Sequence, residues 1–558
     1  MRRYVVFALI LLPLLVSANP QHSAVKETVV SLGHGISGEE IYVNSLKISS
    51  NLKHISYVSR IGKTFRVWLD GVSNKTHDGV TEQSPFFSPQ NNRLAYIAQE
   101  NAKMFVVIDD QEHARYKFVG TITFSPDGSR LAYRVENENK KQQVVVDGQP
   151  GPLFDWGITK EVGIIFSPDS QHMAYVGIND NSSFVLVKDN KKMSSYEKIE
   201  NVIFSPDSRH IAYKAMEKGK WFVVLDDKKG AAYNEINDLL FSPDGSQLVY
   251  SAMKNNRRLI VKNNEEISEG SGTLAPSFSP DGRRFAYLAV EKDNKFCYVV
   301  DGKKELSMDV PGRLLFSSDG TSAAYAAGIE GKWHIIKDGI RGPAFKEIEA
   351  FTYAKATNNI LYAVKNEDGK YSVIKDETAG KFYHAIGTPL FSPDGKQYAY
   401  AAMQQGSTDM FMVINNVEQP SRYPVIGIPA EEKPGKFGFA FQQPYFSPKG
   451  SRMVFPVYDP DKKTAYMVVD GKPHPSFESI MQPIFSDDEK HVAYMARKDG
   501  RWRMVVDGEA GINAFDGIIR GSIIAFDARE RCFFILVASQ KESGLSFFRL
   551  EAKINEPS

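Results

Sequence analysis

The chain has 558 residues, of which 42% are hydrophobic and 24% are charged, so it can bury a large core and is not disordered in bulk. Lys and Arg together number 68 and Asp and Glu number 67, which leaves a formal net charge of +1. Such a balance lacks the basic field that attracts nucleic acid, and we expect no DNA or RNA partner.

The first predicted element is a secretory signal peptide over residues 1–18, MRRYVVFALILLPLLVSA. Arg2 and Arg3 precede an apolar run, and small residues follow where a signal peptidase cleaves. The run is too short to cross a hydrocarbon core of about 30 Å as a helix. We expect an exported protein, periplasmic or extracellular, whose mature chain has no transmembrane segment.

Residues 19–45 form an N-terminal segment that contains ETVVSLGHGISGEEIYV and precedes the first repeat. The last repeat ends at its third strand, LSFFRLEAK, and lacks a fourth. We therefore predict that the N-terminal segment supplies the missing strand and closes a ring, because closure removes exposed strand edges.

A repeat fills the chain from about residue 48 to about residue 550. Its anchor is Phe-Ser-Pro, and one full copy reads FSPDGSRLAY, from Phe124 to Tyr133. Thirteen units can be counted, mostly 37 to 42 residues apart. They begin at Ile48, Phe87, Phe124, Phe166, Phe204, Phe241, Phe278, Phe316, Tyr353, Phe391, Phe446, Phe485 and Phe526.

Each unit predicts four short strands. Apolar residues before the anchor indicate the first strand, and Ser-Pro-Asp-Gly predicts a tight turn, since Pro presets φ and Gly supplies positive φ. The second strand carries a Tyr nine residues after the anchor in eleven units. The third often ends in Asp-Gly, a hairpin signal, and a shorter fourth follows. This is the period of a propeller blade, so the fold class is all-β: tandem β-propellers of about thirteen four-stranded repeats.

The anchor, its turn and the following Ala-Tyr resemble the WD-like propeller repeats of the periplasmic protein TolB and of prolyl-oligopeptidase-type peptidases. The resemblance covers nearly the whole mature chain and implies a propeller. TolB-type proteins carry a separate α/β domain before the propeller, whereas these repeats follow the signal almost at once, so the similarity is to the repeat and not to TolB itself. The peptidases need a G-x-S-x-G motif, which the sequence does not contain.

Thirteen blades exceed the usual four to eight of one propeller, so we expect two rings. The segment EEISEGSGTLAP, Glu265 to Pro276, has the composition of a linker. We place the first propeller, of about six blades, over residues 46–272 and the second, of about seven, over residues 273–558. The alternative is seven blades and then six, with the boundary near Pro311.

Several repeat-wide positions carry residue types that could serve a site, and for each we favour a structural role. The Asp-Gly carboxylates suit the hairpin turn, and a His that alternates with Arg suits an exposed hairpin, so we expect no metal and no cofactor. A Trp that opens a third strand could stack on a sugar, but interblade packing is favoured. Two Cys residues lie far apart in apolar strands and predict buried, unpaired thiols. The residues are Asp70, Asp147, Asp301, Asp338, Asp470 and Asp507; His54, His172, His210 and His491; Trp221, Trp333 and Trp502; Cys297 and Cys532.

The candidate binding site is an insertion between the anchors Phe391 and Phe446, where the spacing rises to 55 residues. We place its residues, SRYPVIGIPAEEKPGKFGFAFQQ, between the fourth strand of one blade and the first strand of the next. Loops of this kind often carry function. An exposed aromatic surface with a basic rim and a hairpin that buries its rings remain equal alternatives. The candidate residues are Tyr423, Lys433, Lys436, Phe437, Phe439 and Phe441.

The function that these patterns favour is that of an exported, non-enzymatic binding or scaffold protein of the cell envelope. Its partner would be an envelope protein or a glycan, held by the loop face of a rigid propeller. The alternative is a propeller enzyme that acts on polysaccharide or peptide at a central pocket. That role needs converging carboxylates or His residues, and the sequence shows none outside the repeat-wide positions.

Overall fold

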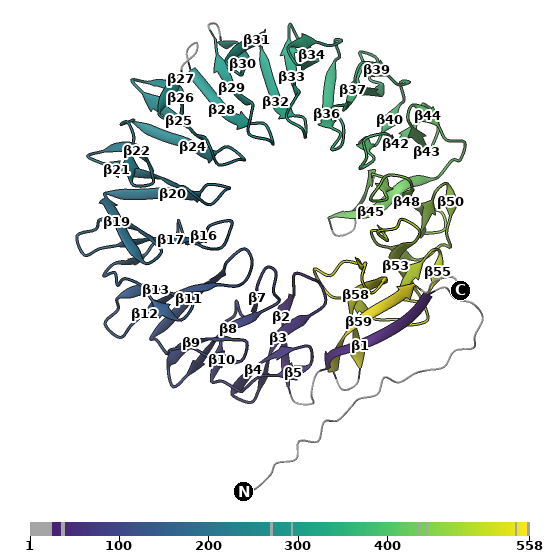
Figure 1. The fold of residues 1–558 in the computed structure, drawn as a ribbon. Helices are drawn as coiled ribbons and strands as arrows, with labels where there is room; N and C mark the ends of the chain where they lie inside the picture. Colours follow the sequence, from purple (N-terminus) through teal and green to yellow (C-terminus); the bar gives the residue numbers. More distant parts are fainter. Residues whose placement is uncertain are drawn as a thin grey trace.

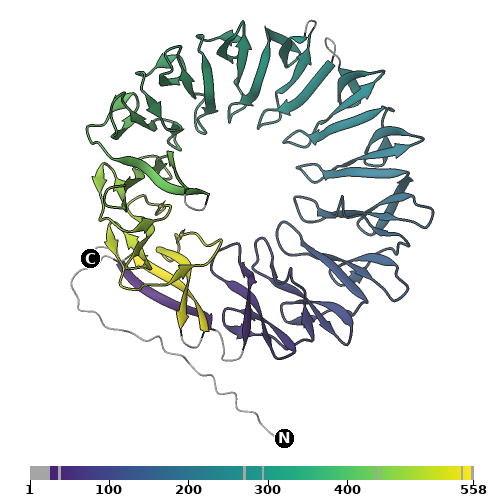
Figure 2. The ribbon, with the colours of Figure 1, turned by 180° about the vertical axis from the view of Figure 1, so that it is seen from behind.

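The protein is an all-β ring. The structure, a computed structural model, describes residues 25–34, 39–267, 272–291, 294–433, 436–441, 443–541 and 544–554. Thirteen antiparallel sheets, the blades, follow one another around a common centre in the order of the sequence (Figures 1 and 2). In twelve of these blades the first strand in sequence lies nearest the centre and the last lies outermost, whereas in the thirteenth the outermost strand is the first strand of the chain, β1 (Figure 1).

The strands fall into four sets by their place in the blade, and β46 is an addition to the eleventh blade. The inner strands, some in two parts, are β2 (Glu40–Ile48), β6 (Gly79–Val80), β7 (Phe86–Phe87), β11 (Phe118–Phe124), β15 (Gly157–Ile158), β16 (Ile164–Phe166), β20 (Lys198–Phe204), β24 (Glu235–Phe241), β28 (Gly272–Phe278), β32 (Val310–Phe316), β36 (Glu347–Tyr353), β40 (Ala385–Ile386), β41 (Leu390–Phe391), β45 (Val425–Lys433), β47 (Tyr445–Phe446), β51 (Ser479–Ile480), β52 (Ile484–Phe485), β56 (Gly517–Ile518) and β57 (Ala525–Asp527). The second strands are β3 (Ile55–Ile61), β8 (Leu94–Glu100), β12 (Leu131–Glu136), β17 (Met173–Ile178), β21 (Ile211–Glu217), β25 (Leu248–Lys254), β29 (Phe285–Val290), β33 (Ala323–Ile329), β37 (Ile360–Lys365), β42 (Tyr398–Met403), β48 (Met453–Asp459), β53 (Val492–Lys498) and β58 (Cys532–Lys541). The third strands are β4 (Thr64–Leu69), β9 (Lys103–Ile108), β13 (Gln142–Val146), β18 (Phe184–Lys188), β22 (Lys220–Leu225), β26 (Arg257–Lys262), β30 (Phe296–Val300), β34 (Lys332–Lys337), β38 (Tyr371–Lys375), β43 (Met410–Ile414), β49 (Thr464–Val469), β54 (Arg501–Val506) and β59 (Gly544–Ile554). The outer strands are β5 (Val72–Ser73), β10 (Gln111–Glu112), β14 (Gln149–Pro150), β19 (Lys191–Tyr196), β23 (Lys228–Lys229), β27 (Glu265–Ile267), β31 (Lys303–Met308), β35 (Ile340–Arg341), β39 (Thr378–Ala379), β44 (Val417–Glu418), β50 (Lys472–Pro473), β55 (Glu509–Ala510) and β1 (Val25–His34), and β46 is Lys436–Phe441.

The two repeated turns form as their residues predict. In the third blade the Ser125 hydroxyl donates to Asp127 Oδ1 at 2.6 Å, and the amide of Gly128, with φ of 73°, donates to the Ser125 carbonyl at 2.8 Å. Asp147 and Gly148 both have positive φ, 50° and 79°, as a two-residue hairpin between the third and fourth strands requires. Ser-Pro-Asp-Gly is therefore a turn, and the Asp-Gly carboxylate is first of all a turn residue.

The hydrophobic core is divided among the junctions between adjacent blades. Each of the thirteen buried clusters joins two neighbouring blades, and every junction has one. The Tyr of the second strand lies in these clusters; Tyr175, for example, is fully buried. Since each cluster buries aliphatic and aromatic side chains from two sheets, neighbouring blades stabilise each other.

The predicted closing strand is present. β1 pairs antiparallel with β59 from Val25 opposite Ile554 to His34 opposite Ser546, and so becomes the outer strand of the last blade. The last blade packs on the first, where Tyr57 and Phe547 have ring centroids 5.0 Å apart. Lys53 of the first blade forms an ion pair with Asp527 of the last.

The structure differs from the expected division into two rings. Gly272, the expected boundary, is the first residue of the inner strand β28, and Pro311, the alternative, lies within β32. One core cluster crosses the first position and joins Val249 and Ile260 to Tyr287. The residues with linker-like composition instead include the short outer strand β27 and the start of β28. Both groups of blades belong to one ring (Figure 1).

Two further expectations concern the termini and the thiols. The predicted signal peptide lies outside the described residues, and the first blade begins within the expected N-terminal segment, at Glu40. Cys297 and Cys532 are buried and do not form a disulfide, as predicted. Within the described ranges, no helix has the length and apolar character needed to span a membrane.

Candidate functional site

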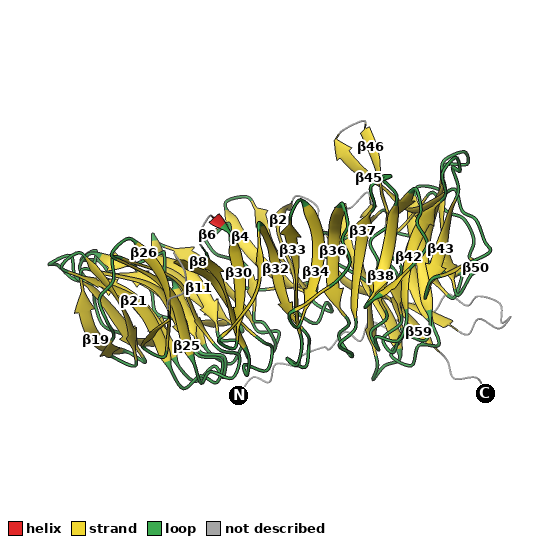
Figure 3. Ribbon diagram, turned by 90° about the horizontal axis from the view of Figure 1, so that it is seen from above, coloured by secondary structure: helices red, strands yellow, loops and turns green. Residues whose placement is uncertain are grey.

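The insertion in the eleventh blade is a β-hairpin that interrupts the inner strand. β45 pairs with β48 only at Val425 and Ile426, and then leaves the blade to pair with β46. The inner strand resumes as β47, where Tyr445 lies opposite Val454. Figure 3 shows the hairpin β45–β46 standing clear of the ring, and in Figure 1 β45 reaches toward the centre.

Neighbouring blades show why the hairpin can leave the ring at this point. In the tenth and twelfth blades the inner strand also has two parts, β40 with β41 and β51 with β52, joined by Gly387-Thr388-Pro389 and Met481-Gln482-Pro483. In the eleventh blade Pro444 holds the same place before β47. The insertion therefore lies within the first strand, and not between the fourth strand and the first as the spacing alone suggested.

The predicted contact residues do not share one environment. Tyr423 is 7% exposed and packs edge to face on Phe455, with ring centroids 5.3 Å apart. Its backbone bridges to Met410, as an aromatic residue or His does at this position in several other blades. Tyr423 therefore belongs to the core and is removed from the candidate surface.

The remaining predicted residues lie on the hairpin itself. Lys433 ends β45 opposite Lys436, and Phe437, Phe439 and Phe441 lie opposite Glu431, Pro429 and Gly427 along β46; their side chains lie outside the described residues. β46 is the terminal strand of its six-stranded sheet. The edge of β46 that faces away from β45 therefore offers backbone N–H and C=O groups that can pair with another extended chain.

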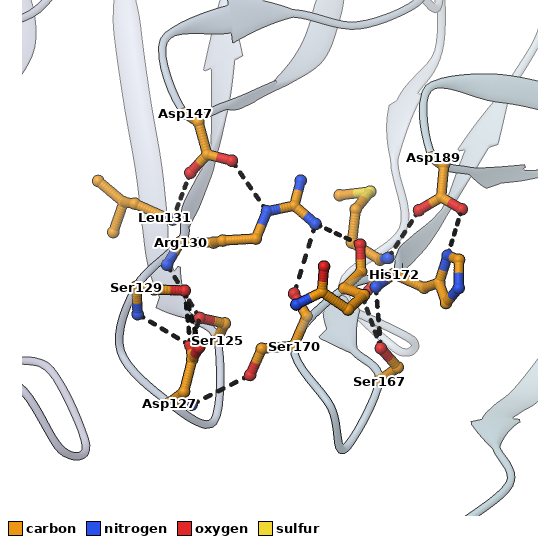
Figure 4. Close-up of polar contacts among 12 residues, drawn as sticks. Ser125, Asp127, Ser129, Arg130, Leu131, Asp147, Ser167, Ser170, His172 and Asp189 are labelled. Atoms are coloured by element: carbon orange, nitrogen blue, oxygen red, sulfur yellow. Dashed lines mark hydrogen bonds and ion pairs between the residues drawn. The ribbon is translucent and has the colours of Figure 1, made fainter. Parts of the chain in front are cut away.

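A second set of polar residues lies on the face that carries the two repeated turns (Figure 4). Arg130 follows the Ser-Pro-Asp-Gly turn, and its Nε donates to Asp147 Oδ2 at 2.9 Å, while Asp147 Oδ1 accepts from the Leu131 amide at 2.8 Å. Arg130 Nη1 donates to the Gln171 carbonyl of the next blade at 2.6 Å. The Asp-Gly carboxylate thus binds the start of the second strand and orients an arginine that links two blades.

This link recurs in other blades of the described residues where Arg lies six positions after the anchor. Equivalent bonds from Nη1 to a carbonyl of the following blade are made by Arg93 to Ser129, Arg284 to Thr321 and Arg452 to Lys490. His at the same position pairs with the carboxylate of the turn between the third and fourth strands of its own blade, as His172 does with Asp189, of the turn Asp189-Asn190, at 2.8 Å. These His residues were predicted to be exposed residues of a hairpin. The structure adds that each contacts a carboxylate of its own blade.

The carboxylate inside each Ser-Pro-Asp-Gly turn accepts several hydrogen bonds. For Asp127 the donors are the Ser125 hydroxyl, the Ser129 amide and the Ser129 hydroxyl. These donors hold the pKa of Asp127 well below its usual range, because they favour the charged form. The turn Asp is therefore ionised and structurally engaged.

Two cavities lie between neighbouring blades. In each case the residue six positions after the anchor is Arg in the first blade and His in the next. The first, about 350 Å³, is lined by Arg130, Val146, Gln171, His172, Met173, Asp189 and Asn190. The second, about 280 Å³, is lined by Arg452, Val469, Asp470, Lys472, His474, Lys490, Val492 and Asp507. The sequence did not predict these cavities. Each is lined by residues of two consecutive repeats, whereas comparing the repeats with one another shows only which residues share a position within a blade.

Aromatic residues that could have stacked on a ligand pack between blades instead. Trp221 is half-buried, bridges through its backbone to Tyr233, and has Lys214 Nζ 5.3 Å from its ring centroid. Trp333 and Trp502 make the same backbone bridge to Phe345 and Phe515. All three side chains pack against buried clusters that join two neighbouring blades, so the interblade role favoured for them is what the structure shows.

No family model matches the chain, and no curated protein does so either. Among solved structures it is similar to a eukaryotic initiation factor, with 13% identity over 63% of this chain and 96% of that one and a TM-score of 0.29. It is also similar to the β-propeller domain of the Trilobed protease from Pyrococcus furiosus, with 14% identity over 47% and 94% and a TM-score of 0.23. The assignment of a propeller fold is supported by the strand pairing of this chain itself. The TolB-like repeat type stays a prediction.

Proposed function

We propose that the protein is an exported, non-enzymatic scaffold of the cell envelope that binds a partner protein through the hairpin β45–β46. The observation that carries the proposal is the insertion of this hairpin into an inner strand, with β46 as a terminal strand of its sheet that stands clear of the ring. An unpaired strand edge recognises an extended peptide through main-chain hydrogen bonds. This chemistry favours a protein over a glycan as the partner at this element.

The ring supports the proposal as a rigid mount. Each junction has its own buried cluster, and the ring closes between Val25 and Ile554. Because a closed ring of packed sheets changes shape little on binding, the hairpin would be presented in one orientation.

A hairpin deletion can be designed from the neighbouring blades. Gly427 to Gln443 are replaced by Gly-Thr, the dipeptide at 387–388, so that Ile426 and Pro444 are joined as Ile386 and Pro389 are. This variant keeps the buried Tyr423, and we expect an unchanged melting temperature together with loss of partner binding.

Site-specific crosslinking locates the contact. A photoreactive amino acid at Lys436 is expected to yield one defined adduct with an envelope protein, identified by mass spectrometry. The same label at Lys462, an exposed position in the turn after β48 of the same blade, is the control and is expected to yield none. Equal adducts from both positions, or retention of the partner by the deletion variant, would contradict the proposal.

Export has a separate test, because the hairpin could bind a partner in any compartment. The full chain is expressed in its own host, and the mature N-terminus is sequenced after fractionation. We expect a chain that begins at Asn19 in the envelope or the medium. An intact Met1 in the cytosolic fraction would remove the envelope from the proposal and leave the hairpin contact standing.

A further inference from the structure

Several junctions between blades contain a small space that two residues share, one from each blade. Both residues are defined by the turn between the third and fourth strands, which begins with Asp or Asn. The rim residue lies four positions after that Asp or Asn and belongs to the first blade of the junction. The turn residue directly follows the Asp or Asn of the next blade. The size of one residue therefore decides how much room is left for the other.

In three junctions the rim residue has a long side chain and the turn residue that faces it is Gly. Between the eleventh and twelfth blades, a Cβ on Gly508 would lie 3.3 Å from the imidazole ring of His474. A side chain at position 508 would therefore compete with this ring for the same space. The other two pairs are His113 with Gly148 and Glu305 with Gly339.

In three other junctions the sizes are reversed, with Gly as the rim residue and Asn as the turn residue. Between the third and fourth blades, a Cβ on Gly151 would lie 2.8 Å from Asn190 Oδ1. Asn tolerates the positive φ of the turn, which is 61° at Asn190. The other two pairs are Gly230 with Asn264 and Gly380 with Asn416. In these six junctions one side chain fills the space, and it comes from either blade.

The junction that closes the ring has Gly at both places. A Cβ on Gly33 would lie 2.8 Å from Tyr57 Oη and 3.3 Å from Gly71 Cα, so the two backbones fill the space themselves. In a division into two rings, the sixth or the seventh blade would dock on the first. Its rim residue, Ile267 or Glu305, would then take the place of Gly33, where no side chain fits. The first blade therefore accepts the thirteenth blade and not the sixth or seventh.

The junction between the eleventh and twelfth blades has a second matched pair, at the Ser-Pro-Asp-Gly turns. In the preceding junction, a Cβ on the turn glycine Gly450 would lie 2.9 Å from the turn carboxylate Asp394. At this junction Lys449 replaces the Asp and Glu489 replaces the Gly. Glu489 is 7% exposed and accepts hydrogen bonds from the Lys449 amide and the Ser451 hydroxyl. The carboxylate of the eleventh turn thus comes from the twelfth blade.

We propose that these complementary pairs determine which blade docks on which, so that thirteen similar blades close as one ring. Similar repeats can otherwise dock out of order, close early or exchange between molecules. A mismatched junction would place two side chains in one space, or would leave buried polar groups without partners. Early closure is the main alternative, because propellers usually have four to eight blades. The inference does not rest on the function proposed for the hairpin β45–β46.

A double-mutant cycle in the full mature chain tests the shared space at the eleventh junction. Gly508→Asn adds a second side chain, and His474→Gly removes the first. Each single variant is expected to lower the urea midpoint of unfolding. The double variant has the Gly and Asn of the junction between the third and fourth blades, so its midpoint is expected to lie above those of both single variants.

The control for this cycle is Gly471→Asn, the same substitution at the same position of the preceding blade. A Cβ on Gly471 meets no described atom within 4 Å, and its φ is 78°, close to the 89° of Gly508. We expect Gly471→Asn to leave the urea midpoint unchanged. Equal losses for the two Gly→Asn variants would assign the effect to the turn itself and overturn the inference at this junction.

A second cycle uses the charged pair of the same junction. Lys449→Asp alone brings two carboxylates together, and Glu489→Gly alone leaves the eleventh turn without one. Both single variants are expected to lower the urea midpoint. The double variant restores the Asp and Gly of the preceding junction, and its midpoint is expected to return toward that of the parent protein.

Refolding shows whether the pairs also select the neighbouring blade. Each variant is diluted from urea, and gel filtration with light scattering gives the fraction recovered as monomer. We expect a smaller monomer fraction from the mismatched single variants than from the parent and the two double variants. Additive losses of midpoint in both cycles would show that the paired residues do not share a space. Coupled midpoints with equal monomer fractions would show that the pairs pack together but do not select a neighbour. Either result would overturn the inference.

Discussion

The tyrosine of the second strand illustrates how a neighbouring blade sets the environment of a single residue. Tyr133 and Tyr175 occupy the same position of the repeat and are both buried. The hydroxyl of Tyr133 lies 3.1 Å from His113 Nδ1, on the outer part of the preceding blade. Tyr175 faces Gly151 at that place and has no partner among the described residues. The sequence of one blade thus decides the hydrogen bonding of the next.

This difference predicts opposite responses to the same substitution. Tyr133→Phe breaks a buried hydrogen bond and is expected to lower the free energy of unfolding by about 1 kcal/mol. Tyr175→Phe removes an unsatisfied buried hydroxyl and is expected to leave that free energy unchanged or to raise it by up to about 1 kcal/mol. Urea midpoints of the two variants check the pair, and a larger loss for Tyr175→Phe would show that its hydroxyl is bonded in solution.

Two histidines at the Tyr contact predict a loss of stability in mild acid. Burial, with smaller effects of nearby charges, holds the pKa of His113 and of His474 below the ordinary value. An imidazole whose folded pKa is lowered stays neutral above the unfolded value of about 6.5, and stability is lost as pH falls from there through the folded value.

The matched variants are His113→Asn and His474→Asn. In the first blade Asn74 holds the same position, with its amide 3.5 Å from the Tyr96 hydroxyl, so Asn preserves the contact without titrating. Between about pH 7.5 and about pH 5, the melting temperature of the double variant is expected to fall by less than that of the parent protein. An identical loss in both proteins would assign the acid sensitivity to other groups.

The role of a single residue could be predicted where that residue stabilises the turn in which it lies. The Asp of Asp-Gly and the Gly of Ser-Pro-Asp-Gly follow from φ alone, as the positive φ of Asp147 and Gly128 shows. The link from Arg130 to the next blade could not be predicted, since it depends on how far one sheet is rotated against another. Tyr423 was misassigned because its role is visible only through its backbone bridge to Met410.

At the scale of elements, the length of an insertion was readable but its place in the blade was not. The spacing between anchors showed extra residues, and the hairpin β45–β46 accounts for them. Its point of departure depends on the split of the inner strand, which leaves only Val425 and Ile426 paired before the hairpin. Pro444, matched by Pro389 and Pro483, was the available signal, because in these three blades a Pro directly precedes the second part of the split strand.

The closing strand β1 predicts how the protein fails when it is shortened. Removal of the chain through His34 uncovers one edge of β59 over its paired length and takes Leu32 from the cluster with Tyr57 and Phe547. We expect oligomers, because an open strand edge pairs with another chain. Light scattering after gel filtration checks this, and a mature chain cut only before Val25 is the control that should stay monomeric. A monomeric form of the shorter chain would show that β1 is dispensable.

At the scale of the whole molecule, the count of blades could be predicted and their partition into rings could not. The anchors number the blades one by one, and the strand pairing confirms thirteen sheets. How many sheets close one ring depends on the angle between neighbours, which is shared among thirteen interblade clusters. No residue in the repeat encodes that angle alone, and the composition near residue 272 pointed to a linker where an outer strand lies.

The single ring predicts a crosslink between the ends of the chain. Lys53 and Asp527 form an ion pair although they are 474 positions apart. A carbodiimide is expected to join them within one monomer, and digestion followed by mass spectrometry should recover the linked peptides. Lys53→Arg keeps the charge but cannot form the amide, and serves as the control. A monomer without this crosslink, but with the first blade linked to the sixth, would favour two rings.

Because β1 is at the start of the chain and its partner β59 is at the end, the closure of the ring has an order in time. The first strand to emerge during synthesis has to remain unpaired until the last strand has followed it. If the chain is exported in the unfolded state, the blades that fold after crossing the membrane would therefore form an open series with two exposed edges. Until its final residues arrive, such a chain depends on chaperones to keep those edges from pairing with other molecules.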